Sequence, residues 1–263
     1  MDLKAEFRDY CLYDLELKTR TVKMYCRRLA YAERIVGKPI HKIKGPDLAA
    51  VKRRAIDGDL GLGRESVKGI QVAVRVFHHW GVRTGRWKLN GISLEKTIRV
   101  PRNLANPLLP DELHALMDAC ARPLEFRLIY GIAYTGMRIG EAAPIDGPMW
   151  RPGWLRFPAE KAEIGAMREV PIHPHLEAVK WEILAHPPTY DSTLQRVKRR
   201  LEAKTGIRFV AHQLRDTFST ALQDVGVSHL CRRELLGHAL GLDGVYSAVS
   251  RREKQEAVAR LPY

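Results

Sequence analysis

The feature that most constrains this chain is a break in its helical periodicity between about residues 90 and 110. Five helix-breaking or turn-forming residues gather there, namely Pro101, Asn103, Asn106, Pro107 and Pro110. Such residues interrupt helices and are typical of segments between domains. Because 263 residues suffice for two units with cores of their own, we predict a domain over residues 1–100, a linker over 101–110 and a second domain over 111–263.

The charge of the chain is distributed unevenly across this break. Residues 1–105 contain 23 Lys and Arg against 11 Asp and Glu, whereas the remainder contains 21 against 19, and the whole chain carries a formal charge of +14. A basic excess of this kind indicates a polyanionic partner, most commonly nucleic acid. A solvated surface that is merely basic is the alternative.

Two helices predicted in the first region are basic on one face and apolar on the other. Helices are expected over residues 21–36 and 64–80, since apolar residues recur at helical spacing and glycines flank both segments. The opposite faces carry the candidate DNA-binding residues Lys23, Arg27, Arg34, Arg64, Lys68 and Arg75. We place His78 and His79 on the helix surface or facing DNA. A helical DNA-binding domain follows, with a solvated charged face as the alternative.

The second region is predicted to be helical with one small β-hairpin. An apolar helix is expected over residues 124–134, and strands over 154–158 and 169–173. Further helices are expected over residues 174–185, 191–204, 211–225 and 228–236. The predicted fold class is therefore mainly α with a small β-sheet.

Three segments of this region concentrate polar residues suited to an anionic group: YTGMRIGEA, AHQLRDTFSTAL and LGHALGLDGVY. The first contains Arg138 after a Thr-Gly break. The second places His212 and Arg215 three positions apart, on one face of a helix. The third contains His238 and Tyr246 on either side of a glycine-rich loop. Taken singly, each histidine or tyrosine is more often a packed structural residue.

These segments resemble the motifs of the tyrosine recombinases, the family that includes phage integrases. TGMRIGE resembles the first arginine box, HQLR the His-x-x-Arg box, and LGH followed by a tyrosine the last box, in the family order from about Pro107 onward. The resemblance implies a helical core-binding domain and a mixed α/β catalytic domain that close on DNA as a C-shaped clamp. Because the first predicted helix begins almost at Met1, we expect a compact form without an arm-binding domain.

The resemblance also implies a role for each motif residue. Arg138 and Arg215 would neutralise the nonbridging phosphate oxygens, since guanidinium is always charged and binds phosphate as a fork. His212 and His238 would donate hydrogen bonds to these oxygens or move a proton. Tyr246 would attack phosphorus and leave a 3′-phosphotyrosyl link with a free 5′-hydroxyl. Each of these residues is therefore a candidate catalytic residue.

Two further residues complete the predicted site. In the family a hairpin lysine protonates the leaving oxygen, and Lys161 is the candidate, although ten positions separate it from Pro171 and predict a longer hairpin tip. A surface lysine is the alternative. Glu141 is expected to orient Arg138 without contacting DNA. Tyr263 is set aside as nucleophile because no similar loop precedes it.

No cofactor is expected. The chain lacks a Gly-rich nucleotide-binding loop, and a phosphotyrosine conserves the energy of the backbone bond without ATP or metal. His173 and His175 lack companions at ligand spacing and indicate a turn, and the four cysteines have no paired spacing. No apolar run is long enough to span a membrane, so we expect a cytoplasmic protein of a bacterial cell or phage-infected host.

The resemblance implies double-stranded DNA with inverted core half-sites as the partner and a homotetramer that exchanges strands through a Holliday junction. The segment from Ser247 to Tyr263 is expected to dock on a neighbouring copy or to fold back on its own domain. Two alternatives remain open: a type IB topoisomerase-like enzyme, which would share the nucleophile and phosphate clamp, and a noncatalytic DNA-binding regulator.

Overall fold

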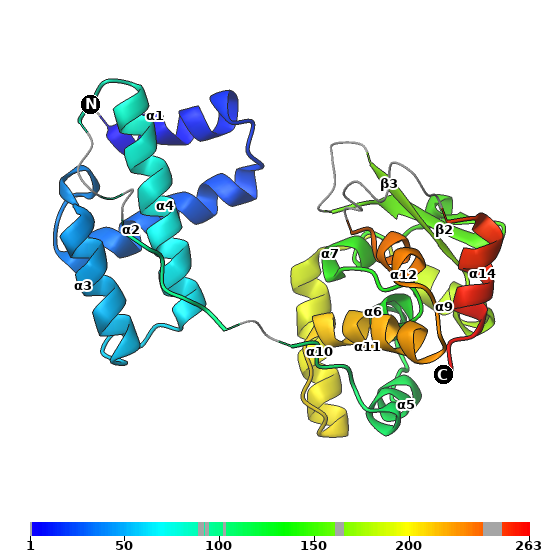
Figure 1. Ribbon diagram of the computed structural model, residues 1–263. Coiled ribbons are helices and arrows are strands. Elements are labelled where there is room, and N and C mark those ends of the chain that lie inside the picture. Colours follow the sequence, from blue (N-terminus) through cyan, green and yellow to red (C-terminus); the bar gives the residue numbers. More distant parts are fainter. Residues whose placement is uncertain (1, 89–91, 93–94, 102–103, 161–165, 239–248) are drawn as a thin grey trace. The chain divides into compact units, whose positions relative to one another are not determined.

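The computed structural model describes residues 2–88, 92, 95–101, 104–160, 166–238 and 249–263. Contacts divide the chain into two compact units, Met1–Asn103 and Leu104–Tyr263, and each has a hydrophobic core of its own. The described chain is mainly helical with a small antiparallel sheet in the second unit (Figure 1), which confirms the predicted fold class.

The first unit is a helical bundle in which α2 packs along α4. Its elements are α1 (Leu3–Asp9), the π-helical turn η1 (Tyr10–Asp14), α2 (Thr19–Val36), the 3-10 turn η2 (Ile40–Lys42), α3 (Gly45–Ile56) and α4 (Arg64–Arg83). Gly37 adopts a left-handed conformation and ends α2. The basic and apolar faces predicted for α2 and α4 therefore lie on real helices of nearly the expected bounds.

The core of this unit is aromatic. The rings of Phe7 and Phe77 meet edge to face with centroids 5.1 Å apart, and Trp80 lies 5.4 Å from Phe77. Trp87 stacks on Phe77 and covers Gly81, where a Cβ atom would lie 1.8 Å from the indole. Only a residue without a side chain permits that approach, so the segment after α4 folds back onto the helix at Gly81.

The prediction that His78 lies on the surface is wrong. Its side chain is 2% exposed and its Nε2 lies 3.0 Å from the carbonyl oxygen of Ile40 in η2. Burial lowers the pKa of His78. His79, the next residue, is exposed as expected. The buried imidazole is tolerated because a backbone acceptor 38 positions away satisfies it.

The second unit is built around α6, which contacts α9, α10 and α11. Its helices are α5 (Pro110–Asp118), α6 (Pro123–Ala133), α7 (Ile139–Ala142), α8 (Pro174–Ala178), α9 (Lys180–Leu184), α10 (Asp191–Thr205), α11 (Ala211–Asp224), α12 (His229–Leu236) and α14 (Arg251–Ala259), and η4 (Gly147–Met149) is a 3-10 turn. The predicted helix over residues 174–185 is interrupted at Val179. Leu128, Ile129 and Ile132 of α6 are fully buried, which accounts for its apolar sequence.

The sheet has three antiparallel strands in the order β1-β2-β3. These are β1 (Trp150–Arg151), β2 (Trp154–Pro158) and β3 (Met167–Pro171). The hairpin prediction is confirmed for β2, whereas β3 begins two residues before the predicted strand and β1 was not predicted. In the β2–β3 register Phe157 pairs with Arg168. Arg168 therefore belongs to the strand, on the face that also buries Val170.

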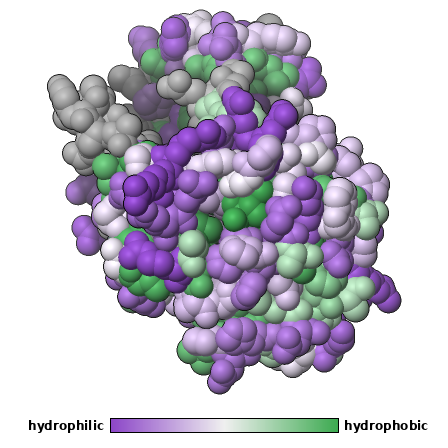
Figure 2. All heavy atoms as spheres, turned by 90° about the vertical axis from the view of Figure 1, so that its right-hand side faces the viewer, coloured by the Kyte–Doolittle hydropathy of each residue, from purple (hydrophilic) through white to green (hydrophobic). Residues whose placement is uncertain are grey.

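The C-terminal segment packs on its own unit. Helix α14 contacts α12 and β3, and Val258 and Leu261 join the core. Figure 2 views the side on which α14 lies in Figure 1, where apolar residues are interspersed among hydrophilic ones. Within the described residues, none of the helices combines the length and apolarity that crossing a membrane requires.

Candidate active site

Arg138 stands at the start of α7, just after the turn that ends α6. Gly136 in this turn has φ +58°, and a Cβ atom there would lie 2.5 Å from the ring of Phe218. Both the backbone conformation and the close packing therefore require glycine. The backbone N–H of Arg138 donates to Glu141 Oε2 at 2.8 Å. This contact caps α7 and fixes the residue that carries the guanidinium.

The carboxylate of Glu141 accepts four hydrogen bonds. Oε1 accepts from Arg138 Nη1 at 3.1 Å and from the backbone N–H of Glu160 at 3.1 Å. Oε2 accepts from Arg168 Nη1 at 2.7 Å and from the Arg138 backbone. Burial would raise the pKa of Glu141, but the charge of Arg168 and these hydrogen bonds hold it below its usual value. Glu141 is thus ionised and bonds both the backbone and the guanidinium of Arg138.

Arg168 of β3 is the second arginine that bonds this carboxylate, and it was not among the predicted site residues. Its side chain is 3% exposed. Nε donates to Leu235 O at 2.7 Å and Nη2 donates to Thr135 O at 2.6 Å. Burial lowers the pKa of Arg168, and the adjacent Glu141 opposes that shift. One sequence signal was available, since an arginine alternates with Val170 on the inward face of a strand.

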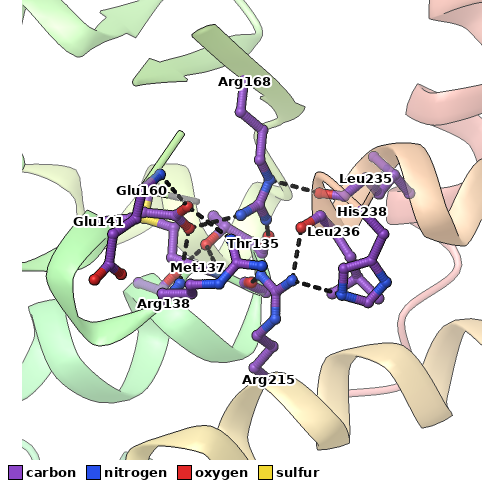
Figure 3. Close-up of polar contacts among 12 residues, drawn as sticks. Thr135, Met137, Arg138, Glu141, Glu160, Arg168, Arg215, Leu235, Leu236 and His238 are labelled. Atoms are coloured by element: carbon purple, nitrogen blue, oxygen red, sulfur yellow. Dashed lines mark hydrogen bonds and ion pairs between the residues drawn. The ribbon is translucent and has the colours of Figure 1, made fainter. Parts of the chain in front are cut away.

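Arg215 projects from α11 toward Arg138 (Figure 3). Its Nη1 donates to Gly136 O, and its Nη2 donates to Leu236 O at 2.6 Å and contacts His238 Nε2 at 3.0 Å. Burial and then the charge of Arg138 lower the pKa of Arg215 to about 10, so it remains protonated at neutral pH. The fork of Arg215 is therefore held by two backbone carbonyls and a histidine.

His238 follows Gly237, which ends α12 in the left-handed conformation. Loss of hydration, together with the charges of Arg215, Arg138 and other nearby arginines, lowers the pKa of His238 to about 4. At neutral pH the ring is uncharged. Because Arg215 can only donate, Nε2 of His238 accepts and the ring proton lies on Nδ1.

The electrostatic balance of this cluster favours an anion. Arg138, Arg168 and Arg215 contribute three positive charges, and His238 is neutral. Glu141 pairs with two of these arginines, and the carboxylates of Glu160 and Asp216 act on Arg215 from a greater distance. Arg168 is sealed in the interior, whereas the side chain of Arg138 is 17% exposed. The accessible part of the cluster is therefore positive and offers hydrogen-bond donors, as binding of a phosphate requires.

The remaining predicted catalytic residues are placed differently. His212 lies on α11 with its side chain 68% exposed and Nε2 3.6 Å from Asp216 Oδ1, outside the hydrogen-bonded cluster. The i, i+3 spacing alone does not bring it to the donors of Arg215, which turn inward. Lys161 and Tyr246 lie outside the described residues. Their roles stay predictions from the motifs.

The predicted DNA-binding residues lie on the surface of the first unit. Lys23, Arg27 and Arg34 of α2 are exposed, as are Arg64 and Lys68 of α4, whereas Arg75 is half-buried. Arg34 also lies over the ring of Tyr31, with its guanidinium carbon 4.5 Å from the centroid. These positions leave the basic side chains open to phosphates, and their contact with DNA stays a prediction. In the described part of the chain, His, Cys, Asp and Glu form no group suited to a metal ion.

Comparison with known proteins identifies proteins that are similar to this chain in sequence and in fold. No protein-family model matches the chain. A curated protein, the tyrosine recombinase XerA of Pyrococcus furiosus, is 26% identical over 221 residues, which cover 74% of each sequence. The chain is therefore similar in sequence to a tyrosine recombinase over most of its length.

Solved structures of integrases share the fold. A lambda integrase tetramer bound to a Holliday junction matches with a TM-score of 0.71 at 18% identity, covering 94% of this chain and 79% of that one. The Tn1549 transposon integrase in complex with circular intermediate DNA matches with a TM-score of 0.61 at 14% identity, covering 98% of both chains. The integrase of mycobacterium phage Brujita gives 0.52 at 17% identity over 98% of this chain and 92% of that chain.

Proposed function

We propose that this chain is a tyrosine recombinase, a site-specific enzyme that integrates phage or mobile-element DNA and cuts and rejoins strands through a phosphotyrosine at Tyr246. The observation that carries the proposal is the convergence of Arg138, Arg215 and His238 in one positive cluster (Figure 3). A DNA phosphodiester is the anion that suits it, because the first unit carries basic faces on α2 and α4. Relatives bound to a Holliday junction and to circular intermediate DNA support this choice.

In the proposed first step the phenol oxygen of Tyr246 forms a bond to phosphorus as the bond to the 5′-oxygen breaks. Arg138 and Arg215 bind the nonbridging oxygens, on which negative charge accumulates in the pentacoordinate transition state. The carbonyls that hold Arg215 before DNA binds reduce the reorganisation needed at this moment. Neutral His238 can turn its donor nitrogen to the same oxygens.

The leaving 5′-oxygen acquires a proton, for which Lys161 is the proposed donor, and the Tyr246 hydroxyl loses one. The product is a 3′-phosphotyrosyl link with a free 5′-hydroxyl. Attack by the 5′-hydroxyl of another strand reverses the bond changes and restores the phenol, so no external energy source enters the cycle. His212 is proposed to join the site once DNA is bound.

We further propose that four copies act on two duplexes with inverted core half-sites and exchange strands through a Holliday junction. In this arrangement the helical unit and the catalytic unit would both contact the duplex. The substrate would be chromosomal and phage DNA. The protein would therefore act in the cytoplasm of a bacterial cell or infected host.

Trapping of a covalent adduct tests the proposal. A duplex site is first selected from random DNA by the wild-type protein. It is then synthesised with a nick near the cleavage position, so that the short fragment carrying the free 5′-hydroxyl diffuses away after cleavage. We expect a denaturation-resistant protein–DNA adduct in wild type and none in Tyr246→Phe, with equal DNA affinity. A phosphotyrosine peptide containing residue 246 would identify the nucleophile by mass spectrometry.

The same reagents separate the alternatives. DNA binding without any adduct would favour a noncatalytic regulator. Adduct formation with plasmid relaxation by single copies, but without synapsis of two duplexes into a four-protomer complex, would favour a type IB topoisomerase. Recombination between two selected sites would support the proposed function.

A further inference from the structure

Arg168 and Arg215 bridge the same two backbone segments, one residue apart. Arg215 joins Gly136 O to Leu236 O, and Arg168 joins Thr135 O to Leu235 O (Figure 3). The two side chains come from different elements, β3 and α11. Two positively charged side chains thus connect the turn after α6 with the end of α12.

Each bridged segment leads directly into a residue of the positive cluster formed by Arg138, Arg215 and His238. The turn containing Thr135 and Gly136 leads into Arg138, and the end of α12 leads through Gly237 into His238. Any change in the separation of the two segments would therefore move Arg138, Arg215 and His238 together.

The third partner of each arginine distinguishes their roles. Arg168 pairs with the carboxylate of Glu141 at 2.7 Å, whereas Arg215 contacts neutral His238. The charge of Arg168 is thus compensated inside the protein, and its side chain is 3% exposed. It cannot reach a DNA phosphate, but it fixes the groups that can.

The side chain of Arg168 is closely packed, which leaves little room for another conformation of this side chain. A Cβ atom at Gly237 would lie 2.9 Å from Arg168 Cδ, and the guanidinium carbon of Arg168 lies 5.0 Å from the centroid of Phe157. The stem of the side chain is therefore enclosed by the glycine of the LGH segment and by the neighbouring strand β2.

We infer that Arg168 is a positioning residue of the recombinase: it sets the separation of the two segments that aim Arg138, Arg215 and His238 at the scissile phosphate. The inference rests on the proposed function. An arginine is required because Nε, Nη1 and Nη2 bond three different acceptors in fixed directions. A lysine ammonium would retain the charge opposite Glu141 but lacks the planar fork.

The test compares Arg168→Lys and Arg168→Met with the matched control Arg127→Met. Arg127 is also fully buried and also bonds backbone carbonyls, but these belong to Ala143, Ile183, His186 and Pro187. Single-turnover adduct formation on the nicked selected duplex gives a rate constant, an end point and, by titration, a DNA affinity. The end point measures the folded active fraction, while the rate constant measures the chemical step.

We expect Arg168→Met to form the adduct about 100-fold more slowly than wild type, as displacement of catalytic groups by about 1 Å does, with unchanged DNA affinity. Arg168→Lys should fold and remain at least about 10-fold slow. Arg127→Met should lower the end point and melting temperature but keep the wild-type rate constant. A wild-type rate constant in Arg168→Lys would overturn the inference, even if Arg168→Met fails to fold.

A second measurement keeps the inference separate from the proposed function. If wild type forms no adduct, the recombinase proposal fails, and inorganic phosphate then serves as the probe. The rise in melting temperature with phosphate, compared with chloride at equal ionic strength, reports occupancy of the anion site. Loss of this rise in Arg168→Lys but not in Arg127→Met would support the positioning role, and its retention in both would overturn it.

Discussion

Glu141 holds Arg138 at two points, accepting one hydrogen bond from its backbone N–H and another from its guanidinium. The same carboxylate accepts from Arg168 and from the backbone at Glu160, where the chain leaves β2. One buried charge therefore connects α7, β3 and the segment that follows β2. The arginine proposed to bind phosphate is therefore oriented by a buried carboxylate.

Glu141→Gln should damage both stability and cleavage. Each carboxylate oxygen accepts two donors, so an amide nitrogen at either position would face donors, and Arg168 would lose its compensating charge. We expect the free energy of unfolding to fall by about 3 kcal/mol, measured by urea denaturation. The adduct rate constant should fall by at least about 10-fold, because Arg138 would lose its fixed orientation.

Glu125→Gln is the matched control. Glu125 is also a buried carboxylate at a helix start, and it accepts from the backbone of Ala121 and Arg122 and from Arg200. Among the described residues it has no contact with the positive cluster. We expect a loss of stability of about 1–3 kcal/mol with a wild-type rate constant. An equal loss of rate in both variants would contradict a specific role of Glu141.

Gly237→Ala should slow cleavage more than its backbone strain explains. Gly237 has φ +64° and faces Arg168, whereas Gly226 has φ +76° and has no atom within 4 Å of the position that a Cβ atom would occupy. Both substitutions should cost about 1–2 kcal/mol of stability from the left-handed conformation. Only Gly237→Ala should also reduce the adduct rate constant, since its methyl group displaces Arg168. Equal rate constants in the two variants would show that the close approach of Gly237 to Arg168 is dispensable.

The basic face of α2 should act through phosphates and not through base edges. Removal of Lys23, Arg27 and Arg34 by alanine substitution should weaken binding to selected and random duplexes alike. The slope of log affinity against log salt should decrease by about 1 for each phosphate that is no longer neutralised. Arg252→Ala, on α14 with its side chain 88% exposed, is the control and should keep the wild-type slope. An unchanged slope in the triple variant would place DNA on another face.

The sequence predicts best those parts of the molecule that depend on local pattern. The apolar and basic stripes of α2 and α4 follow from helical spacing, and the break before Arg138 follows from Thr-Gly after an apolar helix. Glu141 could be assigned because it lies three residues from Arg138. In each case the interacting groups are within one or two helical turns of each other.

Contacts between distant segments could not be predicted in this way. The sequence around Arg168 indicates only a polar residue in a hairpin, because its three acceptors lie 27 to 67 positions away. His78 was placed on the surface because nothing near it indicates the carbonyl of Ile40. Burial of a polar side chain depends on acceptors supplied by tertiary structure, which periodicity does not report.

His173 should make the stability of the second unit depend on pH. Its side chain is 6% exposed, stacks on Tyr134 with centroids 4.7 Å apart, and accepts at Nδ1 from the backbone N–H of His175. Burial, and then the neighbouring His175, lower its pKa from 6.5 to about 4. The unfolded chain therefore binds a proton between these values while the folded chain does not.

The free energy of unfolding should consequently fall as the pH decreases from about 6.5 to about 4, with His173 contributing about 3 kcal/mol of the loss. His173→Asn keeps an acceptor for the His175 N–H but cannot be protonated, so its stability should decline less steeply over this range. Urea denaturation at several pH values measures the difference. His114→Asn, which replaces an exposed imidazole on α5, is the control. A wild-type slope in His173→Asn would mean that protonation of this buried ring does not limit the fold.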